Sequence, residues 1–331
     1  MNNPSISVII PTYNRPGYLV QAVHSVLAQT LPVTEIIIVD DGSDVIHRPA
    51  ICRLETIDKR IKVYLLPENK GASAARNFGL DRSSGNFILF LDDDDLINPN
   101  MILKCTRRFQ EDTKIDIVAC WHAFFYDRTN PDIFSDTSPP SPEQSHSILF
   151  TQKYLSFPTI EQNPFTSLMQ ICIQVSSCLI KKESLQNIRF PEELARNEDC
   201  FFWLTLAASG RNFRIHNECL AYHRIHPFAS LSRSDTANDA HKFYNKIVKS
   251  RLVRHKKDLL LMHIQYSIRL RHFDKSLAIY HAAMFLKYFL QPSVFRSEWK
   301  TICHILITKI SHRWRISQAR KVIIASRSGH A

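Results

Sequence analysis

Four consecutive aspartates, Asp92 to Asp95, directly follow a short apolar segment, GNFILFL at 85–91. Four like charges repel one another, so a folded chain that keeps them together must supply positive charge nearby. Carboxylates within one short turn are hard oxygen ligands that suit Mg²⁺ or Mn²⁺, and these ions also bind phosphate oxygens. The alternative is a solvated acidic turn before a helix that starts near Pro99, where the helix dipole favours negative charge.

Two further groups of residues follow apolar segments nearer the N-terminus. VDDGSD places Asp40 and Asp41 before a glycine, where a carboxylate can accept a hydrogen bond from a ring N–H, although a plain Asp-Gly-Ser turn is also common. PTYN ends another apolar segment with Tyr13, which could stack on a nucleobase or simply pack in a turn. A stacking ring, a base acceptor and metal-binding carboxylates together indicate a site for a nucleoside diphosphate. The motifs GxGxxG and GxxxxGK[ST] are absent, which speaks against a dinucleotide-binding fold and a P-loop.

The segments that carry these residues alternate between short β-branched runs and helical patterns. Strands that alternate with helices predict βαβ units and a mainly parallel sheet. Ligands of such sheets bind outside the carboxyl ends of the strands, so both acidic clusters should face one crevice. The predicted strands cover residues 6–12, 35–41, 60–66 and 86–92, and the predicted helices cover residues 16–29 and 71–83.

The second half of the chain has a different pattern. Residues 127–165 are rich in Pro, Ser, Thr and Asp and predict a long loop followed by short helical pieces. Strands are expected at 174–180 and 213–225, with a helix at 198–209 between them. Residues 238–325 show helical periodicity and predict several amphipathic helices.

Composition narrows the class of protein. A length of 331 residues fits one large domain plus a smaller one, and 44% hydrophobic with 22% charged residues is an ordinary globular composition. The eight cysteines are scattered without a CxxC pair, which argues against a zinc site or a disulfide framework and suits a reducing cytosol. We expect no signal peptide, because MNNPSISVIIPTYN lacks a basic segment followed by a long apolar run. We expect no bilayer-spanning helix, because no apolar run reaches about 18 residues.

The net charge of +11 is unevenly distributed. Residues 237–331 hold 19 Lys and Arg against 4 Asp and Glu, a net charge of +15, while residues 1–236 carry −4. Such asymmetry predicts a boundary near residue 236 and an anionic partner surface, and the mixture of basic and large apolar residues fits amphipathic helices on anionic lipid. The alternative is a helical subdomain packed on the first domain. Nucleic acid is not expected as a partner, because no recognised nucleic-acid module is present.

Four segments, in this order and at these intervals, resemble the family 2 glycosyltransferases with the GT-A fold: SVIIPTYNRPGYL, EIIIVDDGSD, NKGASAARNFGL and GNFILFLDDDD. The resemblance resumes at NEDCFFWLTLAASG (197–210) and YHRIHPFASLSRS (222–234), so it covers the first 235 residues. It implies an α/β fold whose mainly parallel central sheet is flanked by helices. Residues 1–236 would then be the catalytic domain and 237–331 a basic α-helical extension.

The resemblance also implies roles for the acidic residues. Asp92, Asp93 and Asp94 stand at the family's Asp-x-Asp motif, with Asp94 as the metal ligand and Asp93 near the ribose. Asp41 matches the aspartate that meets the uracil N–H, and Asp40 lies beside it.

Further positions match the family's donor site. Tyr13 matches the base-stacking tyrosine, and Pro11 lines the same pocket through its backbone. His226 falls where some members have a histidine near the metal and diphosphate, although a histidine between apolar residues is often a core residue. Arg76 either contacts the donor or fixes its helix through an internal ion pair.

Glu198 and Asp199 match the pair that provides the catalytic base, with Asp199 as the first candidate and Glu198 as the second. A carboxylate there can take the proton from an attacking hydroxyl. Favourable charge at a helix N-terminus is the other explanation of the pair.

The resemblance implies a metal-dependent, inverting glycosyltransferase that uses Mn²⁺ or Mg²⁺ and a nucleotide sugar, most simply a UDP-sugar. Its acceptor would be a saccharide or lipid-linked hydroxyl in cell-surface polysaccharide synthesis, such as lipopolysaccharide or capsule. We expect a cytoplasmic location, peripheral at the inner face of the membrane. One alternative is a nucleotidyltransferase on a similar fold, which needs a GGxGTR-like loop that PTYNRPGY lacks. The other is a non-catalytic basic membrane-surface adaptor, which would not need both acidic clusters.

Overall fold

A computed structural model describes residues 4–126, 150–151, 157–169, 173–225 and 237–253, together with residues 258, 262 and 282. Its internal contacts divide the chain into two compact units, Met1–Leu252 and Val253–Ala331. Very little of the second unit is described, so the fold below is that of the first. The division falls after Leu252, and the helix that follows residue 236 is therefore part of the first unit.

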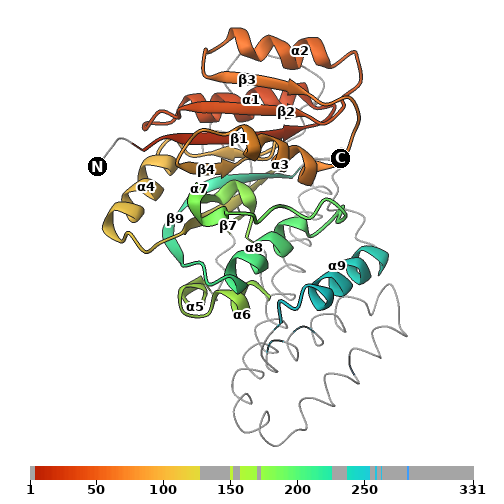
Figure 1. Ribbon diagram of the computed structural model, residues 1–331. Helices are drawn as coiled ribbons and strands as arrows, with labels where there is room; N and C mark the ends of the chain where they lie inside the picture. Colours follow the sequence, from red (N-terminus) through yellow and green to blue (C-terminus); the bar gives the residue numbers. More distant parts are fainter. Residues whose placement is uncertain are drawn as a thin grey trace, which may run out of the picture. The chain divides into compact units, whose positions relative to one another are not determined.

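The described strands form one nine-stranded sheet in the order β3-β2-β1-β4-β8-β6-β9-β5, with β7 added beside β6. Strands β1 to β4 run parallel to one another and lie side by side (Figure 1). Strand β8 lies antiparallel to both β4 and β6, and β9 is parallel to β6. The strands are β1 (Ile6–Thr12), β2 (Glu35–Asp40), β3 (Ile61–Leu65), β4 (Phe87–Phe90), β5 (Leu96–Ile97), β6 (Ile117–Tyr126), β7 (Phe150–Thr151), β8 (Cys178–Lys181) and β9 (Phe213–Ile225).

Helices connect these strands. The α-helices are α1 (Pro16–Leu27), α2 (Arg48–Arg53), α3 (Ala72–Arg82), α4 (Met101–Glu111), α5 (Phe157–Gln162), α6 (Pro164–Leu168), α7 (Lys182–Leu185), α8 (Glu198–Ala208) and α9 (Ala237–Lys249), and the 3₁₀ turns are Leu54–Thr56 and Val175–Ser177. Helix α1 begins at a proline, which suits the first helical turn because its missing N–H is not needed there.

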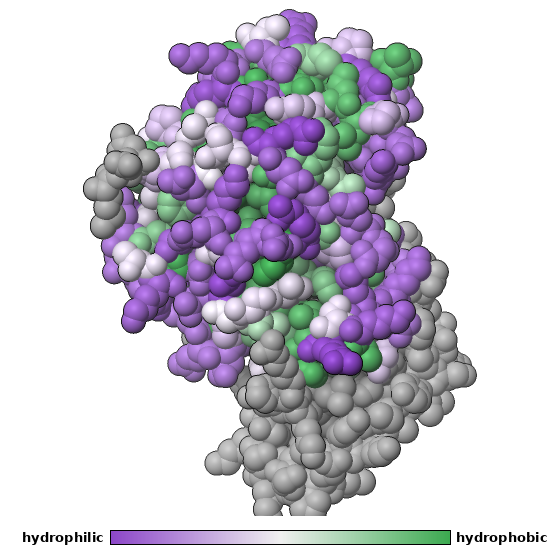
Figure 2. Space-filling view, in the orientation of Figure 1, coloured by the Kyte–Doolittle hydropathy of each residue, from purple (hydrophilic) through white to green (hydrophobic). Residues whose placement is uncertain are grey.

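Strands β1 and β2 are buried on both faces, as expected for parallel strands covered by helices. One face joins the main apolar cluster with residues of α1 and α4. On the other face α3 comes very close, since a Cβ built on Gly79 would lie 2.5 Å from Cγ2 of Ile9. The small residues of α3 therefore allow it to lie directly on the sheet. Figure 2 shows hydrophilic residues over most of the viewed face, outside this apolar interior.

The predicted elements agree with the observed ones to within a few residues through β1, β2, β3, β4, α1 and α3. The segment predicted as a strand at 174–180 is instead a 3₁₀ turn followed by β8, which ends at Lys181. Short helices α5 and α6 occur where short helical pieces were expected. Residues 127–149 and 152–156, and almost all of the predicted tail helices, lie outside the described residues.

Helix α9, the first of the predicted tail, packs against the segment before α8. Nε of Arg196 lies 3.3 Å from Oδ2 of Asp239, and Lys246 forms an ion pair with Glu193. No helix within the described ranges is long and apolar enough to cross a bilayer.

The cysteine prediction needs one correction. Cys200 is disulfide-bonded. Five further cysteines are free: Cys52, Cys105, Cys120, Cys178 and Cys219. The scattered spacing argued against a disulfide framework, and Cys200 shows that it did not exclude a single disulfide.

Candidate active site

The carboxyl ends of β1, β2 and β4 are neighbours, because β1 pairs in parallel with both other strands. Thr12 lies opposite Asp40 in this register, and its hydroxyl donates a 2.7 Å hydrogen bond to Oδ2 of Asp93. The loops after β1 and β2 are also joined, since the Asn14 backbone N–H donates to Oγ of Ser43 at 2.8 Å. The structure thus brings both predicted acidic clusters to one edge of the sheet.

The aspartate turn, Asp92 to Asp95, obtains its first positive charge from Arg15 in the loop before α1. Nη2 of Arg15 lies 2.6 Å from Oδ1 of Asp93, and Nη1 lies 2.6 Å from Oδ2 of Asp94. Burial raises the pKa of Asp93 to about 7, although the Arg15 guanidinium favours its ionised form. One guanidinium therefore bridges the two central carboxylates.

Asp95 is a buried structural carboxylate rather than a ligand facing outward. Its Oδ2 accepts a 2.7 Å hydrogen bond from the Ser176 hydroxyl, and its Oδ1 lies 3.0 Å from Nδ1 of His223 in β9. Burial opposes a charge on His223, but Asp95 and the other aspartates of the turn raise the pKa of His223 to about 9. The pair ties β9 to the aspartate turn.

Arg224, the next residue of β9, supports the main chain of the turn. Its Nε donates a 2.8 Å hydrogen bond to the carbonyl oxygen of Asp94, and its Nη2 donates to Oε1 of Gln21. The guanidinium lies 4.6 Å from the ring centroid of Tyr18 and 4.7 Å from that of Phe125. Such stacking fixes a buried arginine firmly, so the backbone beneath the Asp94 side chain is held in place.

The second cluster, Asp40 and Asp41, is held mainly by backbone N–H groups. Asp40 is fully buried and accepts from the Ser43 N–H at 3.2 Å. Asp41 accepts from the N–H groups of Lys70 and Gly71 at 2.8 and 2.7 Å, one on each oxygen. Burial raises the pKa of Asp41, although these two N–H groups favour the carboxylate.

The two residues of PTYN predicted to line the donor pocket differ in exposure. Tyr13 lies just beyond β1 with 41% of its surface exposed. Pro11, within β1, is buried and pairs with Val39 of β2. The Tyr13 ring is therefore accessible at the same edge as Asp41, as a stacking residue must be.

Arg76 joins the aspartate turn to helix α8. Its Nη2 lies 2.6 Å from Oδ1 of Asp92, its Nη1 lies 3.0 Å from Oε1 of Glu198, and its side chain is only 4% exposed. Its guanidinium lies 5.1 Å from the ring centroid of Phe190. These contacts are the internal ion pairs that the sequence analysis gave as one of two roles for Arg76.

Asp199 lies in the first turn of α8, beside Glu198. The helix begins after Asn197, whose φ of 58° is left-handed and turns the chain sharply into the helix. Burial, together with the neighbouring Glu198 carboxylate, raises the pKa of Asp199 to about 7. A carboxylate with such a pKa is well matched to general-base catalysis near neutral pH.

The structure places ten of the predicted site residues on the elements around this edge: Pro11, Tyr13, Asp40, Asp41, Arg76, Asp92, Asp93, Asp94, Glu198 and Asp199. His226 lies outside the described residues. Sequence reasoning missed the counter-ions of the turn: Arg15, His223 and Arg224. A signal for them existed, because four adjacent carboxylates require nearby cations and all three residues lie within the motifs PTYNRPGYL and YHRIH.

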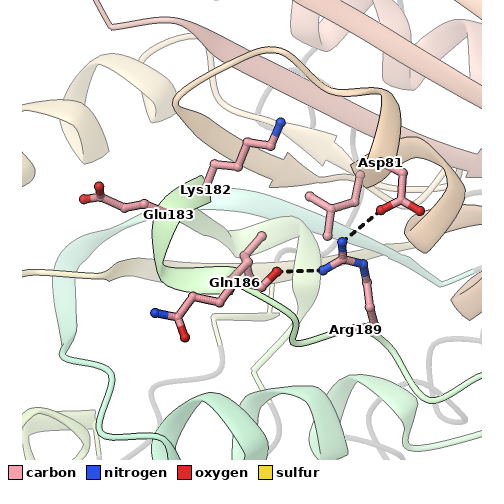
Figure 3. A pocket seen from close by; sticks show the side chains of 7 residues that line it. Asp81, Lys182, Glu183, Gln186 and Arg189 are labelled. Carbon is pink, nitrogen blue, oxygen red and sulfur yellow. Dashed lines mark hydrogen bonds and ion pairs between the residues drawn. The ribbon is translucent and has the colours of Figure 1, made fainter.

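A hollow of about 290 Å³ lies at the opposite sheet edge, between the end of α3 and α7 (Figure 3). Its lining holds two acidic and two basic side chains, Asp81 and Glu183 against Lys182 and Arg189. Nη2 of Arg189 lies 2.9 Å from Oδ1 of Asp81, and Lys182 donates to the carbonyl of Ser83. This hollow therefore lacks the surplus of carboxylates found at the aspartate turn.

The model of the family described as glycosyl transferase family 2 matches residues 7–178, just over half of the chain. The chain belongs to glycosyl transferase family 2. Over 222 residues it is 32% identical to TuaG of Bacillus subtilis, named a putative teichuronic acid biosynthesis glycosyltransferase, and the match covers 67% of this chain and 79% of TuaG. Matches to uncharacterised glycosyltransferases of three Rickettsia species cover only 27% to 31% of those proteins.

Two solved structures share the fold. Staphylococcus aureus TarS 1–349, in complex with UDP-GlcNAc, aligns over 82% of this chain and 74% of its own with a TM-score of 0.58 at 21% identity. The mannosyltransferase PcManGT from Pyrobaculum calidifontis, in complex with GDP-Man and Mn²⁺, aligns over 96% of this chain and 85% of its own with a TM-score of 0.57 at 16% identity. This family 2 chain thus has the GT-A fold predicted for it.

Proposed function

We propose that this chain transfers a sugar from a nucleotide sugar, most simply a UDP-sugar, to an acceptor hydroxyl with inversion of the anomeric centre. One observation carries the proposal: Tyr13, Asp41, the aspartate turn and the start of α8, which holds Glu198 and Asp199, lie at one edge of the sheet although they come from four separate segments. The hollow at the other edge has no comparable set of groups.

The nucleoside would be held by the ends of β1 and β2. The exposed Tyr13 ring offers a stacking surface for the base. Asp41 has both carboxylate oxygens fixed by backbone N–H groups, and the remaining lone pairs can accept a ring N–H. Asp40 and Pro11 support this part of the site from within the strands.

The aspartate turn suits a hard divalent cation such as Mn²⁺ or Mg²⁺. Its donors are carboxylate oxygens, and the side chains of Asp92 and Asp94 are 25% and 15% exposed. We assign Asp94 as a ligand, with Asp93 toward the ribose and His226 near the diphosphate. A bound cation would neutralise the charge that develops on the leaving diphosphate.

Asp199 would take the proton of the attacking hydroxyl. A pKa of about 7 leaves it largely ionised slightly above neutral pH, yet basic enough to accept a proton. Glu198 and Arg76 position Asp199, because their ion pair links the start of α8 to Asp92.

The relatives support the choice of substrates. TarS was solved with UDP-GlcNAc and PcManGT with GDP-Man and Mn²⁺, and TuaG carries a name from cell-surface polymer synthesis. We therefore assign a nucleotide-sugar donor and a saccharide or lipid-linked acceptor in cell-surface polysaccharide synthesis.

The +15 charge of residues 237–331 suits contact with an anionic membrane. Sedimentation with anionic liposomes at increasing salt concentration measures this contact.

The test is a transfer or donor-hydrolysis assay of Asp94→Ala over a panel of nucleotide sugars with and without Mn²⁺. We expect activity to fall at least about a hundredfold, the usual effect of removing one electrostatic contact to a transition state. The melting temperature should hardly change, because Arg15 keeps its contact with Asp93. Asp81→Ala, at the opposite sheet edge, is the matched control. Unaltered turnover of Asp94→Ala would refute the metal role of this carboxylate.

A further inference from the structure

Three arginines surround the aspartate turn, and they differ in how firmly they are fixed. Arg76 is buried between two carboxylates near Phe190, and Arg224 is buried between Tyr18 and Phe125. Arg15 has a side chain that is 28% exposed. It is thus the arginine of the three with the most freedom to change partners.

Arg15 also holds the carboxylate assigned to the metal. Its two terminal nitrogens contact Asp93 and Asp94, one oxygen of each, at 2.6 Å. A cation that binds Asp94 meets a guanidinium already placed on that carboxylate, and the two positive charges repel each other. Arginine and a divalent cation therefore compete for the same negative charge.

A diphosphate would relieve this competition. The planar guanidinium forms paired, charge-assisted hydrogen bonds with phosphate oxygens as well as with carboxylates. Arg15 is two residues from the stacking candidate Tyr13, in a loop fixed by the contacts of Asn14 with Ser43 and Asp44. A nucleotide stacked on Tyr13 would therefore bring its phosphates within the range of the Arg15 side chain.

We propose that Arg15 is an internal counter-ion that makes cation binding depend on the donor. Without nucleotide it neutralises Asp93 and Asp94 and weakens the binding of a divalent cation. With nucleotide it turns toward the diphosphate and leaves Asp94 to the cation, so the nucleotide and the cation strengthen each other's binding. This coupling is reciprocal, as linkage requires. The inference rests on the proposed function, because it needs both a nucleotide and a cation at this edge.

The experiment titrates Mn²⁺, observed by electron paramagnetic resonance, into the full chain with and without UDP. We expect Arg15→Gln to bind Mn²⁺ alone about tenfold more tightly, since a neighbouring arginine changes proton binding to a carboxylate by a factor of about ten or more. The gain in Mn²⁺ affinity that UDP gives should shrink by a similar factor. Arg15→Lys retains the charge and should stay close to the unaltered protein.

Arg48→Gln is the matched control, because Arg48 is 30% exposed and pairs with Asp40 in the other cluster. Its Mn²⁺ affinity without UDP should not change. The inference is wrong if Arg15→Gln binds Mn²⁺ alone no more tightly than the unaltered chain while UDP-dependent Mn²⁺ binding persists, and the proposed function then stands. It is also wrong if Arg15→Lys shows the same increase as Arg15→Gln, because charge is then not the cause. If the unaltered chain binds no Mn²⁺ even with UDP, the proposed metal role and this inference both fail.

Discussion

The two acidic clusters lie at the same sheet edge but are stabilised in different ways. Asp40 and Asp41 accept hydrogen bonds from backbone N–H groups of nearby loops, with Arg48 as the added ion-pair partner of Asp40. The aspartate turn relies on charged side chains from distant segments. These are Arg15 before α1, Arg76 in α3 and His223 in β9.

This difference implies that Asp40 and Asp41 organise the loops beside them, whereas the aspartate turn links segments that are far apart in the sequence. Backbone N–H groups are neutral and fixed by their loop, so Asp41 organises the segment that leads into α3. Side-chain cations carry full charge across long sequence separations, as in the contact between Arg76 and Glu198, which are 122 residues apart. The aspartate turn therefore connects β1, α3, α8 and β9, so a cation bound at the turn can influence all four elements.

The largest effect should follow from breaking the side-chain network at Arg76. Arg76→Gln leaves Asp92 and Glu198 without their shared cation, and loss of one partner of a buried ion pair costs about 3–5 kcal/mol. Chemical denaturation measures this loss of unfolding free energy. Arg189→Gln is the control, because its ion pair with Asp81 is largely exposed and contributes at most about 1 kcal/mol. Equal losses in the two variants would show that the network does not stabilise the domain.

A smaller effect is expected from the backbone-held cluster. Asp41→Ala removes the acceptor of two N–H groups, and the loss of a part-buried hydrogen bond costs about 0.5–1.5 kcal/mol. Amide hydrogen exchange should quicken at Lys70 and Gly71 but not in β9. Asp44→Ala, in the same loop but exposed, serves as the control. Faster exchange in β9 would mean that the two clusters are not separate.

The sequence allowed the strand ends to be predicted but not the partners found there. Short apolar runs fix β1, β2 and β4, and the residues that follow them must emerge at one edge of a parallel sheet. The pairing of Glu198 with Arg76, and that of His223 with Asp95, depend on long-range packing. No local pattern encodes which cation meets which carboxylate, so the internal ion pairs of Arg76 stayed one alternative of two.

The smallest effect concerns the start of α8. It tests whether the ion pairs of Arg76 with Asp92 and Glu198 influence the pKa of Asp199, the proposed base. With Asp199 acting as base, kcat/KM should rise with pH and level off above about 7, where Asp199 has lost its proton. Burial is the main cause of this raised pKa, and the Glu198 charge adds to it. Glu198→Gln removes that charge, so the pKa of Asp199 falls and the rise moves to lower pH by up to about one unit.

The direction in which the pH profile shifts distinguishes an electrostatic effect on Asp199 from a displacement of α8. Arg76 lowers the pKa of Asp199, so Arg76→Gln should move the same rise to higher pH, opposite to Glu198→Gln. Glu183→Gln, exposed at the other sheet edge, should leave the profile unchanged. A shift in the same direction in Glu198→Gln and Arg76→Gln would indicate that α8 has moved. A charge effect instead has opposite signs, because one variant removes a negative charge and the other a positive charge. Opposite shifts would establish that Arg76, which pairs with Asp92 of the aspartate turn, also sets the basicity of Asp199.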